Sequence, residues 1–117
     1  MIRRTKYRNR PTVCKQLHNH QSKKEANRCN ELTLMEKAKV IFNLKQQPKF
    51  PLQYKFDFQG KVIREIAYIA DFSYYDNEKK KFVIEDTKGV KTDVYKLKVK
   101  LLKNILKDAD DFIFIES

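Results

Sequence analysis

The first regular hydrophobic pattern in the chain predicts a helix from Ser22 to about Ile41. Its start, Ser22-Lys23-Lys24-Glu25, has the capping-box arrangement of a serine followed three residues later by a glutamate. Four residues at helical spacing then share one side: Glu25, Cys29, Leu32 and Glu36. Glu25 is therefore expected near the buried face of this helix.

A period of two follows the helix and predicts three strands connected as a meander. Aromatic and aliphatic residues alternate with polar ones from Phe50 to Phe58, and Gln59-Gly60-Lys61 predicts a turn. The second strand is expected from Val62 to Tyr75. After the polar segment 76–80, the third is expected from Phe82 to Lys88.

A second helix and a last strand complete the pattern. Thr92 or Asp93 can cap a helix that extends to about Lys107. Its expected buried stripe is apolar: Val94, Leu97, Leu101 and Ile105. Its opposite face is basic: Lys96, Lys100, Lys103 and Lys107. Residues 112–115 predict a short buried strand, which a crossover helix makes parallel to a neighbour. The fold class is therefore α/β with a small mixed sheet.

Length and composition limit the domain organisation and the setting. A chain of 117 residues fits one domain. Residues 1–21 are basic and lack periodicity, which predicts an N-terminal arm before a single domain at 22–117. No apolar run reaches the roughly 18 residues of a membrane span. The two cysteines form no disulfide framework, so a reducing, cytoplasmic setting is expected.

The charge narrows the class of partner. Lysine and arginine number 26 against 15 aspartate and glutamate residues, a formal net charge of +11. Such an excess is typical of nucleic-acid binding, because cations that neutralise phosphates release counterions and bind without sequence choice. A basic protein that is merely soluble is the alternative.

Two acidic residues are predicted to meet where the second and third strands end. Asp71 lies late in the second strand, and Asp86-Thr87-Lys88 closes the third. A spacing of two puts Asp86 and Lys88 on one face, whereas Glu85 points to the other. Pairing of the two strands can bring Asp71 beside Asp86, and two such carboxylates suit Mg²⁺ or Mn²⁺. A neighbouring lysine can stabilise charge on a reacting phosphate or position the attacking water.

These residues carry a resemblance to a known superfamily. Glu25, Asp71 and Asp86-Thr87-Lys88, in the order helix, three strands, helix, strand, resemble the PD-(D/E)XK nucleases. The resemblance implies a restriction-endonuclease-like core, Asp71 and Asp86 as metal ligands, Lys88 as the catalytic lysine, and Glu25 completing or supporting the metal site. Ala70 replaces the usual proline, and Asp86 stands where glutamate is commoner. The chain also resembles, from about residue 5 to 116, a family of small phage and prophage proteins of unknown function.

Lys98 and a set of cysteines and histidines each have two interpretations. Lys98 falls among apolar positions of the second helix; it either extends its amine to solvent or, as the superfamily resemblance implies, reaches the scissile phosphate. Four residues have the types that bind zinc: Cys14, His18, His20 and Cys29. Their spacing is that of no standard zinc finger, and Cys29 also suits the core as a small apolar residue. Structural zinc is the less favoured alternative.

Together these features predict a Mg²⁺- or Mn²⁺-dependent DNA endonuclease that hydrolyses phosphodiester bonds. The phage resemblance suggests branched DNA, such as Holliday junctions, cut by a homodimer, since two symmetric nicks need two sites. A nicking or end-processing phage nuclease without branch preference is one alternative. A DNA-binding protein without catalysis is the other, and a protein bound to a membrane surface is least favoured.

Overall fold

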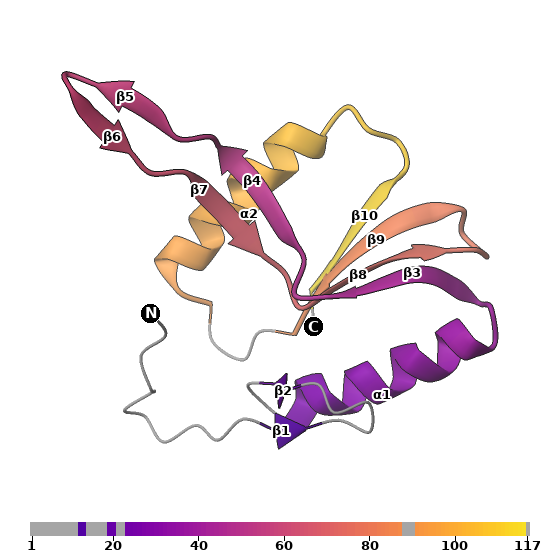
Figure 1. Ribbon diagram of the computed structural model, residues 1–117. Helices are drawn as coiled ribbons and strands as arrows, with labels where there is room; N and C mark the ends of the chain where they lie inside the picture. Colours follow the sequence, from indigo (N-terminus) through magenta and orange to yellow (C-terminus); the bar gives the residue numbers. More distant parts are fainter. Residues whose placement is uncertain (1–11, 14–18, 21–22, 88–90, 117) are drawn as a thin grey trace.

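A four-stranded mixed sheet with helix α1 against one face forms the body of the computed structural model (Figure 1). The structure describes residues 12–13, 19–20, 23–87 and 91–116. Its elements in chain order are β1 (Thr12–Val13), β2 (Asn19–His20), α1 (Lys23–Lys37), β3 (Ile41–Gln46), β4 (Lys49–Gln53), β5 (Phe56–Phe58), β6 (Lys61–Ile63), β7 (Ile66–Ile69), β8 (Phe72–Asp76), β9 (Lys81–Asp86), α2 (Asp93–Leu106) and β10 (Phe112–Glu116). No helix among these residues is both long and apolar enough to cross a membrane.

The strand order of the main sheet is β10-β9-β8-β3. β3 and β9 are each antiparallel to β8, and β10 is parallel to β9. The prediction of an α/β fold with a mixed sheet, closed by a parallel last strand, is therefore confirmed. The short strands β1 and β2 pair within the expected N-terminal arm and lie beside α1.

Helix α1 ends at Lys37, so its predicted extension to Ile41 is wrong. Lys39 adopts a left-handed φ of 63°. Its amide donates to the carbonyl of Glu36 at 3.0 Å, and the amide of Val40 donates to the carbonyl of Met35 at 2.9 Å. This is a Schellman termination, in which glycine is usual at the left-handed position. Because lysine occupies that position, the sequence lacks the ordinary stop signal.

The predicted first and second strands are each interrupted, and the first does not belong to the main sheet. One edge strand of that sheet is β3, which was not predicted: Ile41 was expected to end the helix, and no element was assigned to the residues that follow it. The chain then leaves the sheet as the β-extension (residues 49–69), in which β4 pairs with β7 and β5 with β6. It returns as β8. The predicted turn at Gln59-Gly60 is confirmed, with φ values of 51° and 76°.

Two apolar clusters pack on the two faces of the sheet. Under α1 the buried members are Ala26, Cys29, Leu32, Ile41, Phe72, Tyr74 and Val83. On the other face, between the sheet, α2 and the β-extension, they are Tyr68, Ala70, Ile84, Val99 and Leu102. Consecutive residues of β9 therefore point alternately at α1 and at α2.

The second helix agrees with its predicted bounds but not with its predicted buried face. Thr92 caps α2, because its hydroxyl accepts a hydrogen bond from the amide of Tyr95 at 3.1 Å. The stripe expected to be buried is 38–62% exposed: Val94, Leu97, Leu101 and Ile105. The face that packs inward is centred on Val99 and Leu102, about a third of a turn away. The prediction is wrong because it chose one of two apolar rows on the helix.

Candidate functional site

Asp71 lies at the point where β8 and β9 separate. Their pairing ends with Phe72 opposite Glu85, and the chain before Phe72 bends away into the β-extension. The carbonyl of Asp71 accepts a hydrogen bond from the amide of Gln47 at 2.9 Å, which fixes the bend. Its carboxylate remains near the end of β9, where Oδ2 accepts from both the amide and the hydroxyl of Thr87, each at 2.7 Å.

Asp86 is the last residue of β9 and is fully buried on the α2 face. The hydroxyl of Tyr68 donates a hydrogen bond to its Oδ2. Tyr68 belongs to β7, so the β-extension folds back over the strand end. Burial, and then the hydrogen bond to Asp86, raise the pKa of the Tyr68 phenol far above its usual value. Tyr68 therefore stays protonated and supplies a hydrogen bond without positive charge.

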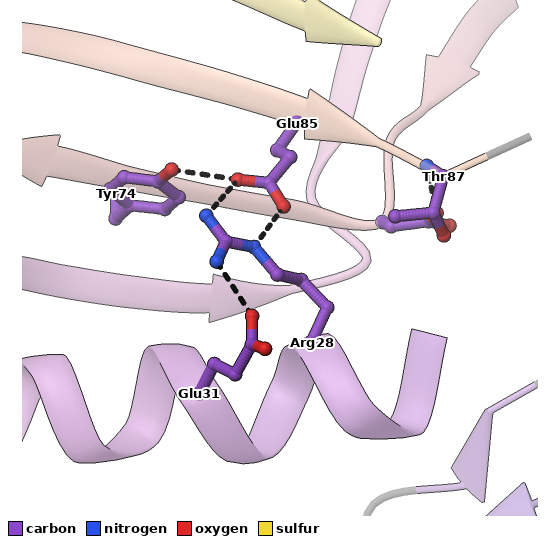
Figure 2. Close-up of polar contacts among 6 residues, drawn as sticks. Arg28, Glu31, Tyr74, Glu85 and Thr87 are labelled. Carbon is purple, nitrogen blue, oxygen red and sulfur yellow. Dashed lines mark hydrogen bonds and ion pairs between the residues drawn. The ribbon is translucent and has the colours of Figure 1, made fainter. Parts of the chain in front are cut away.

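Glu85 faces α1 and is held by a different set of groups (Figure 2). Arg28 donates from Nε to Oε2 at 2.5 Å and from Nη2 to Oε1 at 3.0 Å. Tyr74 donates to Oε1 at 2.7 Å, and Glu31 accepts from Arg28 Nη1 at 2.8 Å. The paired bonds to Glu85 raise the pKa of Arg28, whereas burial is the main cause of the raised pKa of Tyr74. Glu85 is thus a neutralised, structural carboxylate.

A second tyrosine–carboxylate pair lies beside Asp86. Glu116 is the register partner of Asp86 on the parallel strand β10. The hydroxyl of Tyr95 donates to Glu116 Oε2 at 2.5 Å, and Lys91 Nζ lies 3.1 Å from Oε1. The hydrogen bond from Tyr95, and then Lys91, lower the pKa of the Glu116 carboxyl. The rings of Tyr68 and Tyr95 are 6.2 Å apart, so the two pairs form one polar cluster on the α2 face.

A hollow of about 380 Å³ opens on the α1 side of the strand ends. It is lined by Lys24, Asn27, Arg28, Glu31, Glu85, Thr87 and Ile115. Thr87, which binds Asp71, forms part of its wall, so the hollow reaches the edge of the carboxylate site.

The structure brings Asp71 and Asp86 to neighbouring strand ends, as their spacing predicted. Asp71 is 7% exposed, and its carboxylate binds the residue that directly follows Asp86. Glu25 is 3% exposed in the first turn of α1, on the buried side where it was expected. Lys88 lies outside the described residues.

Lys98 lies among apolar positions of α2, as predicted. Lys98 is half-buried, between the inward face of α2 and its exposed apolar stripe. It forms no ion pair with any residue that the structure describes. Its expected contact with a phosphate stays a prediction.

The oxygen donors at the strand ends fit a small divalent cation. No group of three or more His, Cys, Asp or Glu side chains that could hold a metal occurs within residues 23–87 and 91–116. Glu25 therefore does not join Asp71 and Asp86 in a three-carboxylate cluster. Mg²⁺ needs only one or two carboxylates, because water and substrate phosphate fill its other positions. Asp71 and Asp86 meet that requirement.

The zinc alternative depends largely on undescribed groups. Cys29 is fully buried in the α1 core, and its thiol donates to Gln46 Oε1 at 3.7 Å. Cys14 and His18 lie outside the described residues, and only the backbone of His20 is described. Packing of Cys29 as a small core residue is confirmed.

The aromatic and basic partners of the carboxylates were not predicted. Tyr68, Tyr74 and Tyr95 appear in the sequence as ordinary apolar positions, but each donates a hydrogen bond to an acid near a strand end. Arg28 had a detectable signal, since it follows Glu25 by three residues and thus shares a helix flank with it. Its pairing with Glu85, 57 residues away, depends on the tertiary fold.

A family model described as a protein of unknown function, DUF1064, matches residues 4–115. No curated protein and no solved structure matches the chain. Since the family model spans nearly the whole sequence, the chain belongs to the DUF1064 family.

Proposed function

We propose that this protein is a metal-dependent DNA endonuclease with a restriction-endonuclease-like core. The observation that carries the proposal is the junction of Asp71 with Asp86-Thr87 at the end of β9. The Asp71 carboxylate binds the backbone and side chain of Thr87, and Asp86 is the residue before it. The sheet order β3-β8-β9-β10, with a helix before β3 and one before β10, agrees with the core that the nuclease resemblance implies.

In this proposal Asp71 and Asp86 hold Mg²⁺ or Mn²⁺. When bound, the cation lowers the pKa of a coordinated water and offsets negative charge on the phosphate being cleaved. Thr87 orients Asp71 through two hydrogen bonds, and Tyr68 orients Asp86 through one. Both carboxylates are thus fixed before substrate arrives, which reduces the reorganisation needed during reaction.

Three other residues have proposed roles. Lys88, two residues after Asp86 in the sequence, is proposed to stabilise the charge that develops on the phosphate. Glu25 supports the metal site from the first turn of α1. Lys98 is proposed to contact the DNA backbone.

The substrate we propose is branched DNA, such as a Holliday junction. The net charge of +11 supports nucleic acid as the partner. Two symmetric nicks require two sites, and the described residues contain one such carboxylate pair. A homodimer supplies the second.

The exposed apolar stripe of α2 is the surface we assign to this homodimer. Val94, Leu97, Leu101 and Ile105 are all exposed, although they form a continuous row. Two copies that each carry this excess of positive charge repel unless they meet on an uncharged surface. Light scattering should detect a dimer, and Leu97→Lys with Leu101→Lys should convert it to monomer. A monomeric wild-type chain, with and without junction DNA, would remove the dimer from the proposal.

A DNA-binding protein without catalysis is the second candidate, and a nicking or end-processing nuclease is a variant of the first. The hydrogen bonds that hold Asp71 and Asp86 at adjoining strand ends support the catalytic candidate over a binding protein without catalysis.

Cleavage assays on matched four-way junction, duplex and single-stranded DNA test the proposal. Each is run with Mg²⁺, Mn²⁺ or EDTA, beside Asp86→Ala. Cutting that needs metal, fails in Asp86→Ala and is confined to the junction supports the full proposal. Equal cutting of all three DNAs retains the nuclease and removes the branch preference. Tight binding without cutting in either metal supports the binding protein instead.

A further inference from the structure

A lysine-lined hollow lies on the α2 side of the strand ends. It has a volume of about 280 Å³ and runs along the first turns of α2 to the end of β10. Four lysines line it, together with one carboxylate: Lys91, Lys96, Lys100, Lys103 and Glu116. Tyr95 forms part of its wall. This hollow is separate from the one beside Thr87, which lies on the α1 side.

The single carboxylate in the hollow is already bound. Glu116 accepts a hydrogen bond from Tyr95 at 2.5 Å and pairs with Lys91 at 3.1 Å. The other three lysines form no ion pair with a described residue. Lys103 Nζ lies 5.3 Å from the centroid of the Phe114 ring, a neutral partner. The hollow therefore has an excess of positive charge.

The hollow is next to Asp86. Glu116 is paired with Asp86 across β9 and β10, and both side chains face α2. Tyr95, in the wall of the hollow, packs at a tilt against Tyr68, which binds Asp86. A molecule in the hollow thus lies one strand away from the candidate metal ligand.

We propose that this hollow binds consecutive phosphates of a DNA strand beside the bond that is cut. Lys96, Lys100 and Lys103 share one flank of α2 and span about 10 Å along its axis at ~1.5 Å per residue. That length equals the rise of about three phosphates of one strand, measured along the axis of a duplex at ~3.4 Å each. The proposal rests on the proposed nuclease function for its substrate, but its binding surface does not depend on catalysis.

The test is the salt dependence of DNA binding by the full chain, measured in EDTA with fluorescently labelled duplex and four-way junction DNA. The variant is Lys96→Gln/Lys100→Gln/Lys103→Gln. The matched control, Lys37→Gln/Lys39→Gln/Lys79→Gln, removes the same charge from exposed lysines at the opposite end of the sheet. Circular dichroism of both variants checks that they are folded.

Loss of three phosphate contacts should reduce the slope of log K against log salt by about 2.7. Between roughly 50 and 200 mM salt, the wild type and the control should then lose about 40-fold more affinity than the hollow variant does. Equal slopes for the two variants would overturn the proposal, since binding would then follow net charge alone. No binding by the wild type would overturn it as well.

Cleavage separates this proposal from the nuclease. If the wild type cuts DNA and the hollow variant binds and cuts normally, the proposed phosphate-binding role of the hollow is wrong, whereas the nuclease function is supported. Suppose instead that the wild type does not cut, and that the salt dependence of binding falls in the hollow variant but not in the control. The phosphate-binding role of the hollow is then supported, whereas the nuclease function is wrong.

Discussion

Glu85 and Asp86 are consecutive acids at the end of one strand, yet they have opposite surroundings. Glu85 faces α1, where Arg28 binds both of its oxygens and Tyr74 adds a third hydrogen bond. Asp86 faces α2, where the phenol of Tyr68 donates to one oxygen. Both side chains are buried to nearly the same degree. Burial alone therefore does not distinguish a structural acid from a candidate ligand.

The two acids differ in the partners whose hydrogen bonds are described. A guanidinium that binds two oxygens cancels the charge of Glu85 and leaves little for a ligand to use. The Tyr68 phenol donates to Asp86 without adding positive charge, and the amide and hydroxyl of Thr87 do the same for Asp71. We therefore propose that Glu85 serves folding, and that Asp86 and Asp71 serve the proposed cleavage.

The largest expected effect is on stability, from Arg28→Met. The change leaves Glu85 buried without its cation, which should lower the free energy of unfolding by about 3–5 kcal/mol. Urea denaturation measures this. Adding Glu85→Gln should recover a large part of the loss, because the unpaired charge is gone. If the double variant is no more stable than Arg28→Met, the role of Glu85 as a paired structural acid is wrong.

Asp71→Asn should affect activity more than folding. The asparagine oxygen can still accept from Thr87, but it binds a divalent cation more weakly. We expect metal-dependent cleavage to fall by at least about 100-fold, with binding to junction DNA in EDTA unchanged. Asp76→Asn, at the last residue of β8, is a control of the same chemistry and should cut normally. Equal losses in both variants would contradict the assignment.

Alkaline pH should weaken the fold through its buried tyrosines. Burial raises the pKa values of Tyr68 and Tyr74, whereas tyrosines of the unfolded chain ionise near pH ~10. Their contribution to stability is therefore complete below pH ~10 and is lost as the pH rises above it, at up to about 1.4 kcal/mol per pH unit for each tyrosine.

Urea denaturation at several pH values between 8 and 11 tests this dependence. Tyr68→Phe should remove about one tyrosine's share of the slope. Tyr54→Phe, at an exposed position, should leave the slope unchanged. The same slope in all three proteins would show that Tyr68 ionises alike in the folded and unfolded chains.

The smallest expected effect comes from Thr87→Val. It removes the hydroxyl that donates to Asp71 at 2.7 Å and keeps the amide that also donates. Loss of one hydrogen bond should cost about 1 kcal/mol of stability, and looser positioning of Asp71 should raise the metal concentration needed for half-maximal cleavage. Thr87→Ser should restore both values. A serine variant as impaired as the valine variant would show that shape, not the hydroxyl, matters at this position.

The sequence predicted the order of elements better than their ends. Three predictions that depend on short patterns in the sequence are confirmed. They are the strand β9, the helix cap at Thr92 and the parallel last strand. The end of α1 was missed because Lys39 takes a position where glycine is usual. The β-extension was missed because alternation continues through residues 50–58 while the chain leaves the sheet.

The candidate site was predictable for its acids but not for their partners. Spacing along the strands was enough to bring Asp71 to the end of β9 next to Asp86. Hydrogen bonds from Tyr68 and Arg28 join residues 18 and 57 positions apart, so they depend on how the β-extension and α1 pack against the sheet. No periodic pattern in the sequence encodes such distances.

The different roles of Asp86 and Glu85 are tested by comparing Asp86→Asn with Glu85→Gln in one cleavage assay on junction DNA with Mg²⁺. Both substitutions replace a buried carboxylate of β9 with its amide, and they differ in the face of the sheet. We predict that Asp86→Asn binds the junction but cuts at least about 100-fold more slowly. Glu85→Gln should cut at the wild-type rate at a temperature where it remains folded. Normal cutting by Asp86→Asn, or equal loss in both folded variants, would contradict the account.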